Sequence, residues 1–212
     1  MKKFVVFSVL ATGAASSLAA SVTLNGPIVE GGTGFGSILN VLALQGNGSE
    51  AGAVGWDGFA DVVTGDATSF SQTRSVGEIL ASGANVSNFG VVFNIAQPGN
   101  NPDVMLNQFT VVFYSASGSE LFTASFNTPT VLTQIGSGVG GAGYLFDITF
   151  DPFEANFFAN ATNRIGIRVT DPITGSQGAP ENFYLVPAPS AFLLAGFAGL
   201  MSNARRRRQT GC

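Results

Sequence analysis

Residues 109–126 read FTVVFYSASGSELFTASF, two apolar runs separated by five small and polar residues. In the first run Phe109, Val111 and Phe113 alternate with the residues between them, which is the side-chain period of a β-strand. The second run occupies residues 121–126. The connection, Ser115 to Ser119, contains Gly118 and has the length of a hairpin loop. These residues therefore predict two strands joined as an antiparallel hairpin.

The same period of two recurs along the chain at residues 144–150 and 164–169. Shorter apolar segments predict further strands near Ile38 to Leu44, Phe59 to Val63, Phe89 to Ala96 and Phe183 to Val186. Segments with a helical period are short, and Asp151 to Asn160 has room for one or two helical turns. Glycine concentrates in the expected connections, at Gly31 to Gly36, Gly46 to Gly58 and Gly136 to Gly143.

Many short strands with few helices indicate an all-β fold, and we expect an antiparallel β-sandwich of jelly-roll character at residues 21–185. We expect a signal helix before this domain and a hydrophobic helix after it. No repeat of fixed period is present, which disfavours a propeller or a solenoid. The segment GSGVGG at residues 136–141 matches a dinucleotide-binding pattern, but a predicted strand follows it rather than a helix, so we expect a β-connection.

The first twenty residues are typical of a secretion signal. Two lysines are followed by an apolar run at residues 4–10 and then by small residues. Ser17 and Ala19 place small side chains at positions −3 and −1 of a cut before Ala20. We therefore expect export through the Sec machinery.

The other end of the chain carries three ordered parts. Pro187 and Pro189 precede an apolar run at residues 191–201, which is followed by a cluster of four cations, Arg205, Arg206, Arg207 and Arg208. A helix at residues 190–204 would be about 22 Å long, which is short for a hydrocarbon core of about 30 Å. The arginine cluster marks the cytoplasmic end of this marginal span.

These ordered parts resemble the sorting tail of PEP-CTERM proteins, with Ala188 where the namesake motif has glutamate. The resemblance covers residues 186–208 and leaves residues 209–212 as a C-terminal remnant. It implies recognition by an exosortase, a membrane protease-transpeptidase that cuts near the Pro-x-Pro motif after transient anchoring in the inner membrane. The expected sorting motif is Val186, Pro187, Ala188, Pro189 and Ser190.

The composition of the domain excludes several chemistries. Histidine is absent, the single cysteine is Cys212, and lysine occurs only at the N-terminus, so His-based triads, Schiff-base lysines and thiolate metal sites have no residues. Six of the nine cations lie in the two terminal segments. The domain keeps three cations and all thirteen carboxylates, a net charge of about −10. Such a surface repels phosphate backbones, so we expect no nucleic-acid partner.

Carboxylates are the remaining candidates for chemistry. Two of them held at a set separation would permit glycoside hydrolysis, and a cluster would bind calcium. The candidates are Asp57, Asp61, Asp66, Asp147, Asp151 and Glu154, of which the first three form the weak calcium candidate. Trp56 adjoins Asp57 and offers either a plate for a sugar or a packed core residue.

The sequence predicts a non-enzymatic protein of the cell surface or extracellular matrix, associated with exopolysaccharide and requiring no cofactor. The alternatives are a secreted carbohydrate-active hydrolase and a calcium-dependent carbohydrate-binding module. No residue pattern names a ligand.

Overall fold

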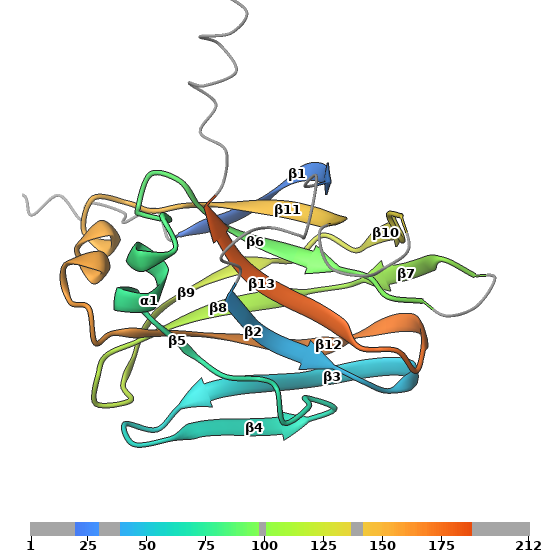
Figure 1. Ribbon diagram of the computed structural model, residues 1–212, viewed down its shortest axis with the longest axis horizontal. Helices are drawn as coiled ribbons and strands as arrows, with labels where there is room; N and C mark the ends of the chain where they lie inside the picture. Colours follow the sequence, from blue (N-terminus) through green and yellow to red (C-terminus); the bar gives the residue numbers. More distant parts are fainter. Residues whose placement is uncertain (1–19, 30–38, 98–100, 137–141, 188–212) are drawn as a thin grey trace, which may run out of the picture.

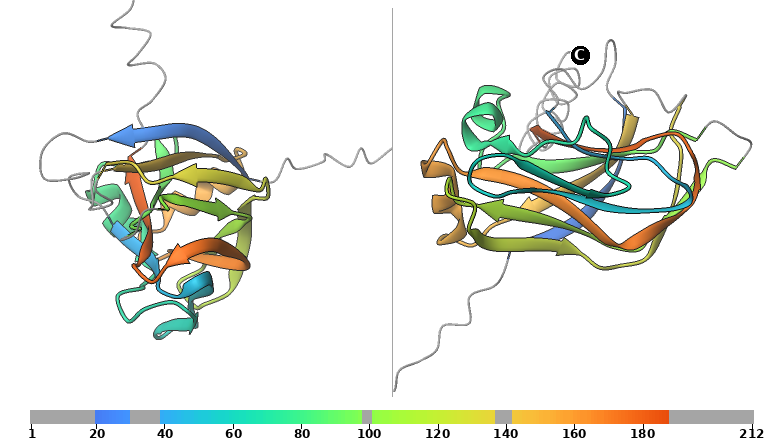
Figure 2. Two further views of the ribbon diagram at one scale, coloured as in Figure 1. Left: turned by 90° about the vertical axis from the view of Figure 1, so that its right-hand side faces the viewer. Right: turned by 90° about the horizontal axis from the view of Figure 1, so that it is seen from below.

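The computed structural model describes residues 20–29, 39–97, 101–136 and 142–187. These residues are mostly β-strand, and the strands form one sheet that curls around the interior (Figures 1 and 2). Within the described residues, no helix is long and apolar enough to cross a membrane.

Most of the residues predicted to direct export and sorting lie outside the described part of the chain, as does the predicted helix at residues 190–204. They are Ser17 and Ala19 of the signal cleavage site, Ala188, Pro189 and Ser190 of the sorting motif, and the cytoplasmic cluster Arg205, Arg206, Arg207 and Arg208. The predictions made for these residues stay predictions. Ala20, Val186 and Pro187 are described and belong to the domain.

The elements follow in chain order as strands with two short helices. They are β1 Ser21–Val29, β2 Leu39–Leu44, β3 Asn47–Trp56, β4 Asp61–Gly65, β5 Arg74–Ser75, α1 Val76–Ala81, β6 Phe89–Asn94, β7 Asp103–Leu106, β8 Phe109–Tyr114, β9 Glu120–Phe126, β10 Thr130–Thr133, β11 Ala142–Thr149, the 3-10 helix η1 Glu154–Ala159, β12 Arg164–Gln177 and β13 Glu181–Pro187.

The sheet runs in the order β10-β7-β12-β8-β9-β1-β11-β6-β13-β2, and β12 also pairs with β3 and β5. Among the described strands, every pairing is antiparallel except a single bridge between Ser21 of β1 and Ser125 of β9. Strand β3 continues the sheet to β4. This places β4, β3, β12, β8 and β9 in one continuous surface.

The predicted hairpin of residues 109–126 is confirmed as β8 and β9. The Ser115 amide donates to the Ser119 carbonyl across the loop (2.8 Å). Gly118 has φ +89°, and a Cβ there would lie 2.6 Å from the Gly58 amide nitrogen. Glycine is therefore required where this loop packs on the turn after β3.

Phenylalanine fills the interior between the curled faces of the sheet. Six phenylalanines are fully buried, on β6, β8, β11 and β13: Phe89, Phe93, Phe109, Phe113, Phe146 and Phe183. Their rings meet mainly in tilted and edge-to-face geometry, for example Phe109 and Phe146 with centroids 5.0 Å apart. Edge-to-face contacts exploit the ring quadrupole in addition to apolar burial.

Several sequence-based expectations were wrong in detail. Residues 46–58 were expected to connect strands, but residues 47–56 form β3. The glycines there permit close approach: a Cβ on Gly52 would lie 2.7 Å from the Thr64 carbonyl oxygen of β4. Strands β1, β7 and β10 were not predicted, and neither was α1, whose capping box joins Ser75 and Glu78.

The final strand also extends further than the expected domain end at residue 185. Val186 and Pro187, the first two residues of the predicted sorting motif, belong to β13 and lie opposite Gly90 and Phe89 of β6. The predicted short helix within 151–160 is confirmed as η1.

Candidate functional site

A cleft lies on the β4-β3-β12-β8 surface and has a volume of about 330 Å³. Its walls combine two aromatic side chains, a guanidinium group, a hydroxyl and apolar groups. The lining residues are Ala53, Val54, Gly55, Trp56, Val62, Thr64, Tyr114 and Arg168. Aromatic faces with a few polar groups are the common composition of a small-ligand site.

The register of the strands brings these residues together from distant parts of the sequence. Arg168 of β12 lies opposite Ala53 of β3, and Ala53 lies opposite Thr64 of β4. On the other side of β12, Arg164 lies opposite Tyr114 at the end of β8. The cleft thus depends on four strands being paired correctly.

Two glycines make room for the Tyr114 ring. A Cβ on Gly55 would lie 3.0 Å from the Tyr114 hydroxyl oxygen, and one on Gly166 would lie 3.2 Å from Tyr114 Cε2. Burial, and then the charge of Glu120, raise the pKa of the Tyr114 hydroxyl. The hydroxyl is therefore protonated at neutral pH and can donate a hydrogen bond.

Trp56 is fixed in place by two contacts. Its Nε1–H donates to the Ala116 carbonyl in the β8–β9 loop (2.9 Å). The guanidinium carbon of Arg164 lies 4.2 Å from the ring centroid, which is a cation–π contact. Trp56 is half-buried, so it is neither the fully packed core residue nor the free aromatic plate considered from sequence.

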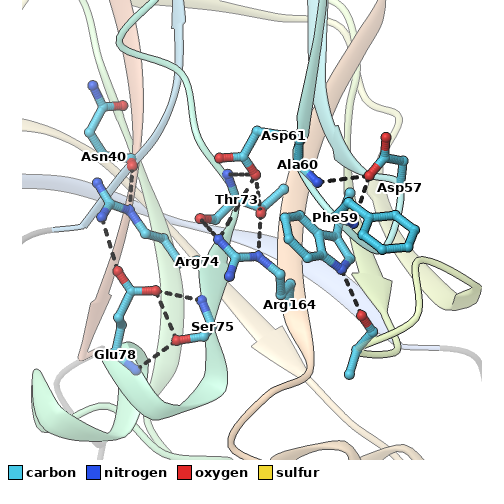
Figure 3. A network of polar contacts seen from close by, with 12 residues as sticks. Asn40, Asp57, Phe59, Ala60, Asp61, Thr73, Arg74, Ser75, Glu78 and Arg164 are labelled. Carbon is cyan, nitrogen blue, oxygen red and sulfur yellow. Dashed lines mark hydrogen bonds and ion pairs between the residues drawn. The ribbon is translucent and has the colours of Figure 1, made fainter.

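Arg164 is itself held by a network with Thr73 and Asp61, shown in Figure 3. Its Nε donates to the Thr73 hydroxyl (2.7 Å) and its Nη2 to the Thr73 carbonyl (3.0 Å). Asp61 accepts hydrogen bonds from the Thr73 amide and hydroxyl and lies 3.9 Å from Arg164. These contacts connect Asp61 to Trp56 through Thr73 and Arg164. They fix the orientation of the indole ring that lines the cleft.

Arg168 lines the cleft and is more exposed to solvent than Arg164. Its Nη2 lies 3.6 Å from Glu120 Oε1, and the two side chains are 39% and 44% exposed. An ion pair exposed to this degree exchanges readily with solvent and contributes little to stability. Arg168 can therefore turn toward an anionic group of a ligand.

The three aspartates expected as a calcium site have separate hydrogen-bond partners. Asp57 Oδ1 accepts from the amides of Phe59 and Ala60, both at 2.8 Å, and these hydrogen bonds lower the pKa of Asp57. Asp66 accepts from the Ala51 amide, and Asp61 belongs to the Arg164 network. In the described part of the chain, no three His, Cys, Asp or Glu side chains come together as metal ligands.

The other three acidic candidates, Asp147, Asp151 and Glu154, each have different hydrogen-bond partners. Asp147 accepts from the side-chain Nδ2 of Asn25 on β1 (2.7 Å). Asp151 accepts from the backbone amides of Phe153 and Glu154, in the turn that precedes η1. Glu154 accepts from the amide of Ala20, which stands directly after the predicted signal cleavage site.

No pattern in the sequence marked Tyr114, Arg168, Gly55 or Gly166 as parts of a site. Tyr114, Gly166 and Arg168 were correctly placed in predicted strands, but the facing residues on β3 and β4 were not predictable without the register. A period of two identifies faces and not neighbours.

Comparison with protein-family models, with curated proteins and with solved structures finds no match to this chain.

Proposed function

We propose that the chain is an exported, non-enzymatic protein of the cell surface or extracellular matrix, sorted by an exosortase, whose β-domain binds exopolysaccharide. In this proposal the curled sheet is a β-sandwich of jelly-roll character. The observation that carries the sorting part is the order of the three C-terminal segments behind an N-terminal secretion signal.

The contact that Ala20 makes supports cleavage of the signal at this position. Its amide donates to Oε1 of Glu154 (2.9 Å), and both residues are nearly inaccessible. The residue that would begin the processed chain is therefore held by the domain.

The cleft supports the binding part. Trp56 and Tyr114 supply aromatic surface, Thr64 a hydroxyl, and Arg168 a cation in a domain with few cations. Carbohydrates present apolar ring faces and many hydroxyls. An aromatic surface beside one adaptable guanidinium group matches that chemistry.

Affinity electrophoresis of the exported protein in gels containing the producing cells' own matrix polysaccharide tests binding. Tyr114→Ala and Arg168→Gln should each weaken retardation about tenfold, since each removes about 1–2 kcal/mol of contact. Arg74→Gln is the matched control, because Arg74 does not line the cleft and pairs with Glu78. Equal retardation of all variants would contradict the cleft as the binding site.

Incubation of the exported protein with the same polysaccharide in solution tests the hydrolase alternative. A binding protein leaves the polysaccharide intact, whereas a hydrolase releases new reducing ends over time. Release of reducing ends that follows the protein through purification would contradict the non-enzymatic proposal.

A further inference from the structure

A second polar group lies inside the domain, away from the cleft. Glu50 on β3 and Glu181 at the start of β13 are both 0% exposed, and Gln97 after β6 is 6% exposed. The two carboxyl groups lie within hydrogen-bonding reach of each other. Two glutamates fully withdrawn from water are rare unless each is compensated.

The turn between β2 and β3 lies beside the turn between β12 and β13 at one end of the sheet (Figure 1). The two turns are in contact, because Gln45 Nε2 donates to the Gly178 carbonyl (2.9 Å). Glu181 lies opposite Leu44 at the end of β2. The three side chains belong to widely separated segments of the chain and meet in the interior of the domain.

Hydrogen bonds satisfy only part of this group. The Gly46 amide donates to Glu50 Oε1 (2.7 Å), and Gln97 Nε2 donates to Glu181 Oε1. With both glutamates ionised, Glu50 Oε2, Glu181 Oε2 and Gln97 Oε1 are buried without a hydrogen-bond donor. All three unsatisfied atoms are oxygens that accept, so the missing partner is a donor or a cation.

No protein cation fills that role among the described residues. The three ion pairs there involve Arg74, Arg164 and Arg168, and each of them pairs with a different acid. Removing one partner from a buried charge is strongly destabilising, so an unpaired pair of carboxylates requires neutralisation. Protonation or a bound cation would provide it.

We propose that Glu50, Glu181 and Gln97 form a buried binding site for a divalent cation, with Ca²⁺ the expected occupant. Carboxylates are hard ligands, which calcium prefers, and the Gln97 carboxamide, which now points its nitrogen at Glu181, would turn its oxygen toward the ion. Sites of this kind in extracellular modules bind in the range of about 10⁻⁴–10⁻³ M. The proposal does not depend on how the chain is sorted or on the cleft.

A proton replaces the cation when none is bound. Burial, and then the hydrogen bond and charge of Glu50, raise the pKa of Glu181 to about 10.

Thermal unfolding of the exported protein at about pH 8, with EDTA or with CaCl₂, tests the site. Calcium at about 100 times its Kd should raise the Tm by about 5–10 °C, as expected for a ligand that binds only the folded chain. Calorimetric titration should give one calcium ion per chain. MgCl₂ and MnCl₂ in parallel identify the preferred ion.

Glu181→Gln is the decisive variant because it keeps the shape and the neutral charge of the protonated side chain, so it should fold. It should lose at least nine-tenths of the calcium-induced Tm shift while its Tm in EDTA stays equal to that of the unchanged protein or rises. Asp171→Asn, an exposed carboxylate on β12, is the control and should keep the full shift. An unchanged protein with no Tm shift in any of the three ions would overturn the proposal, as would a Glu181→Gln protein with the full shift.

Discussion

The backbone amide of Ala20 donates a 2.9 Å hydrogen bond to Oε1 of Glu154, although the two residues are 134 positions apart. Both are nearly inaccessible, with 7% and 9% exposure. The other carboxylate oxygen of Glu154 accepts from the Asp151 amide. The residue that follows the predicted signal cleavage site is therefore attached to the domain through a buried acid.

Cleavage before Ala20 would turn this amide nitrogen into an α-ammonium group facing Glu154. In the processed protein we expect Glu154→Gln to lower the free energy of unfolding by about 1–3 kcal/mol, since it leaves a buried cation without its charged partner. Urea unfolding measures the change. Asp171→Asn should change it by less than about 0.5 kcal/mol; a Glu154→Gln protein as stable as this control would count against an ammonium group at Ala20.

Stability should fall as pH rises in metal-free solution. An unfolded glutamate titrates near 4.5, whereas folded Glu181 titrates near 10. The folded chain therefore holds a proton that the unfolded chain has lost, so the contribution of Glu181 is complete below about pH 4.5 and disappears as pH approaches 10. The slope from this group is at most about 1.4 kcal/mol per pH unit.

Urea unfolding in EDTA at about pH 5.5, 7 and 8.5 measures this slope. Asp57 does not interfere, because its pKa is lowered and its effect on stability is confined to more acidic solution. The Glu181→Gln protein should show a flatter dependence in the same range. Identical slopes for the two proteins would mean that Glu181 is ionised in the folded chain.

The Arg164 network should control the position of Trp56. Arg164→Lys keeps the charge but loses the paired hydrogen bonds to Thr73 and the flat contact with the indole. We expect the free energy of unfolding to fall by about 1–2 kcal/mol and the tryptophan fluorescence to shift to longer wavelength. The fluorescence reports Trp56 alone because the chain has one tryptophan. Arg168 is not the cation that contacts the Trp56 ring, so Arg168→Lys should leave the emission maximum unchanged.

Two glycines should respond in opposite directions to alanine. A Cβ on Gly166 would overlap the Val54 carbonyl oxygen, so Gly166→Ala should cost more than about 2 kcal/mol. A Cβ on Gly77 in α1 would meet nothing closer than 3.4 Å, and Gly77→Ala should stabilise the protein by about 0.5–1 kcal/mol. The Tm of each variant measures these changes, and the Gly166→Ala result tests the packing of β12 against β3.

The class of fold was predictable from residues 109–126, because a period of two and a short polar loop depend only on local sequence. The buried site was not predictable. Glu50 lies in a segment with five glycines between residues 46 and 58, which resembles a loop until β12 and β4 are seen on either side of it. The contact between Glu50 and Glu181 exists only after β3 and β13 are brought together by the sheet.

The acidic candidates chosen from sequence show the same limitation. Asp57 and Asp66 adjoin turns, where aspartate bonds to nearby backbone amides, so proximity in sequence indicated caps rather than ligands. The acids that lie together, Glu50 and Glu181, come from opposite ends of the domain sequence.

Mass spectrometry of the intact protein recovered from the cell surface and the medium tests the sorting proposal most directly. The predicted chain begins at Ala20, ends near residues 187–190 apart from any group added by the transpeptidase, and lacks all four arginines, Arg205, Arg206, Arg207 and Arg208. A majority of molecules that retain these four arginines would contradict exosortase processing.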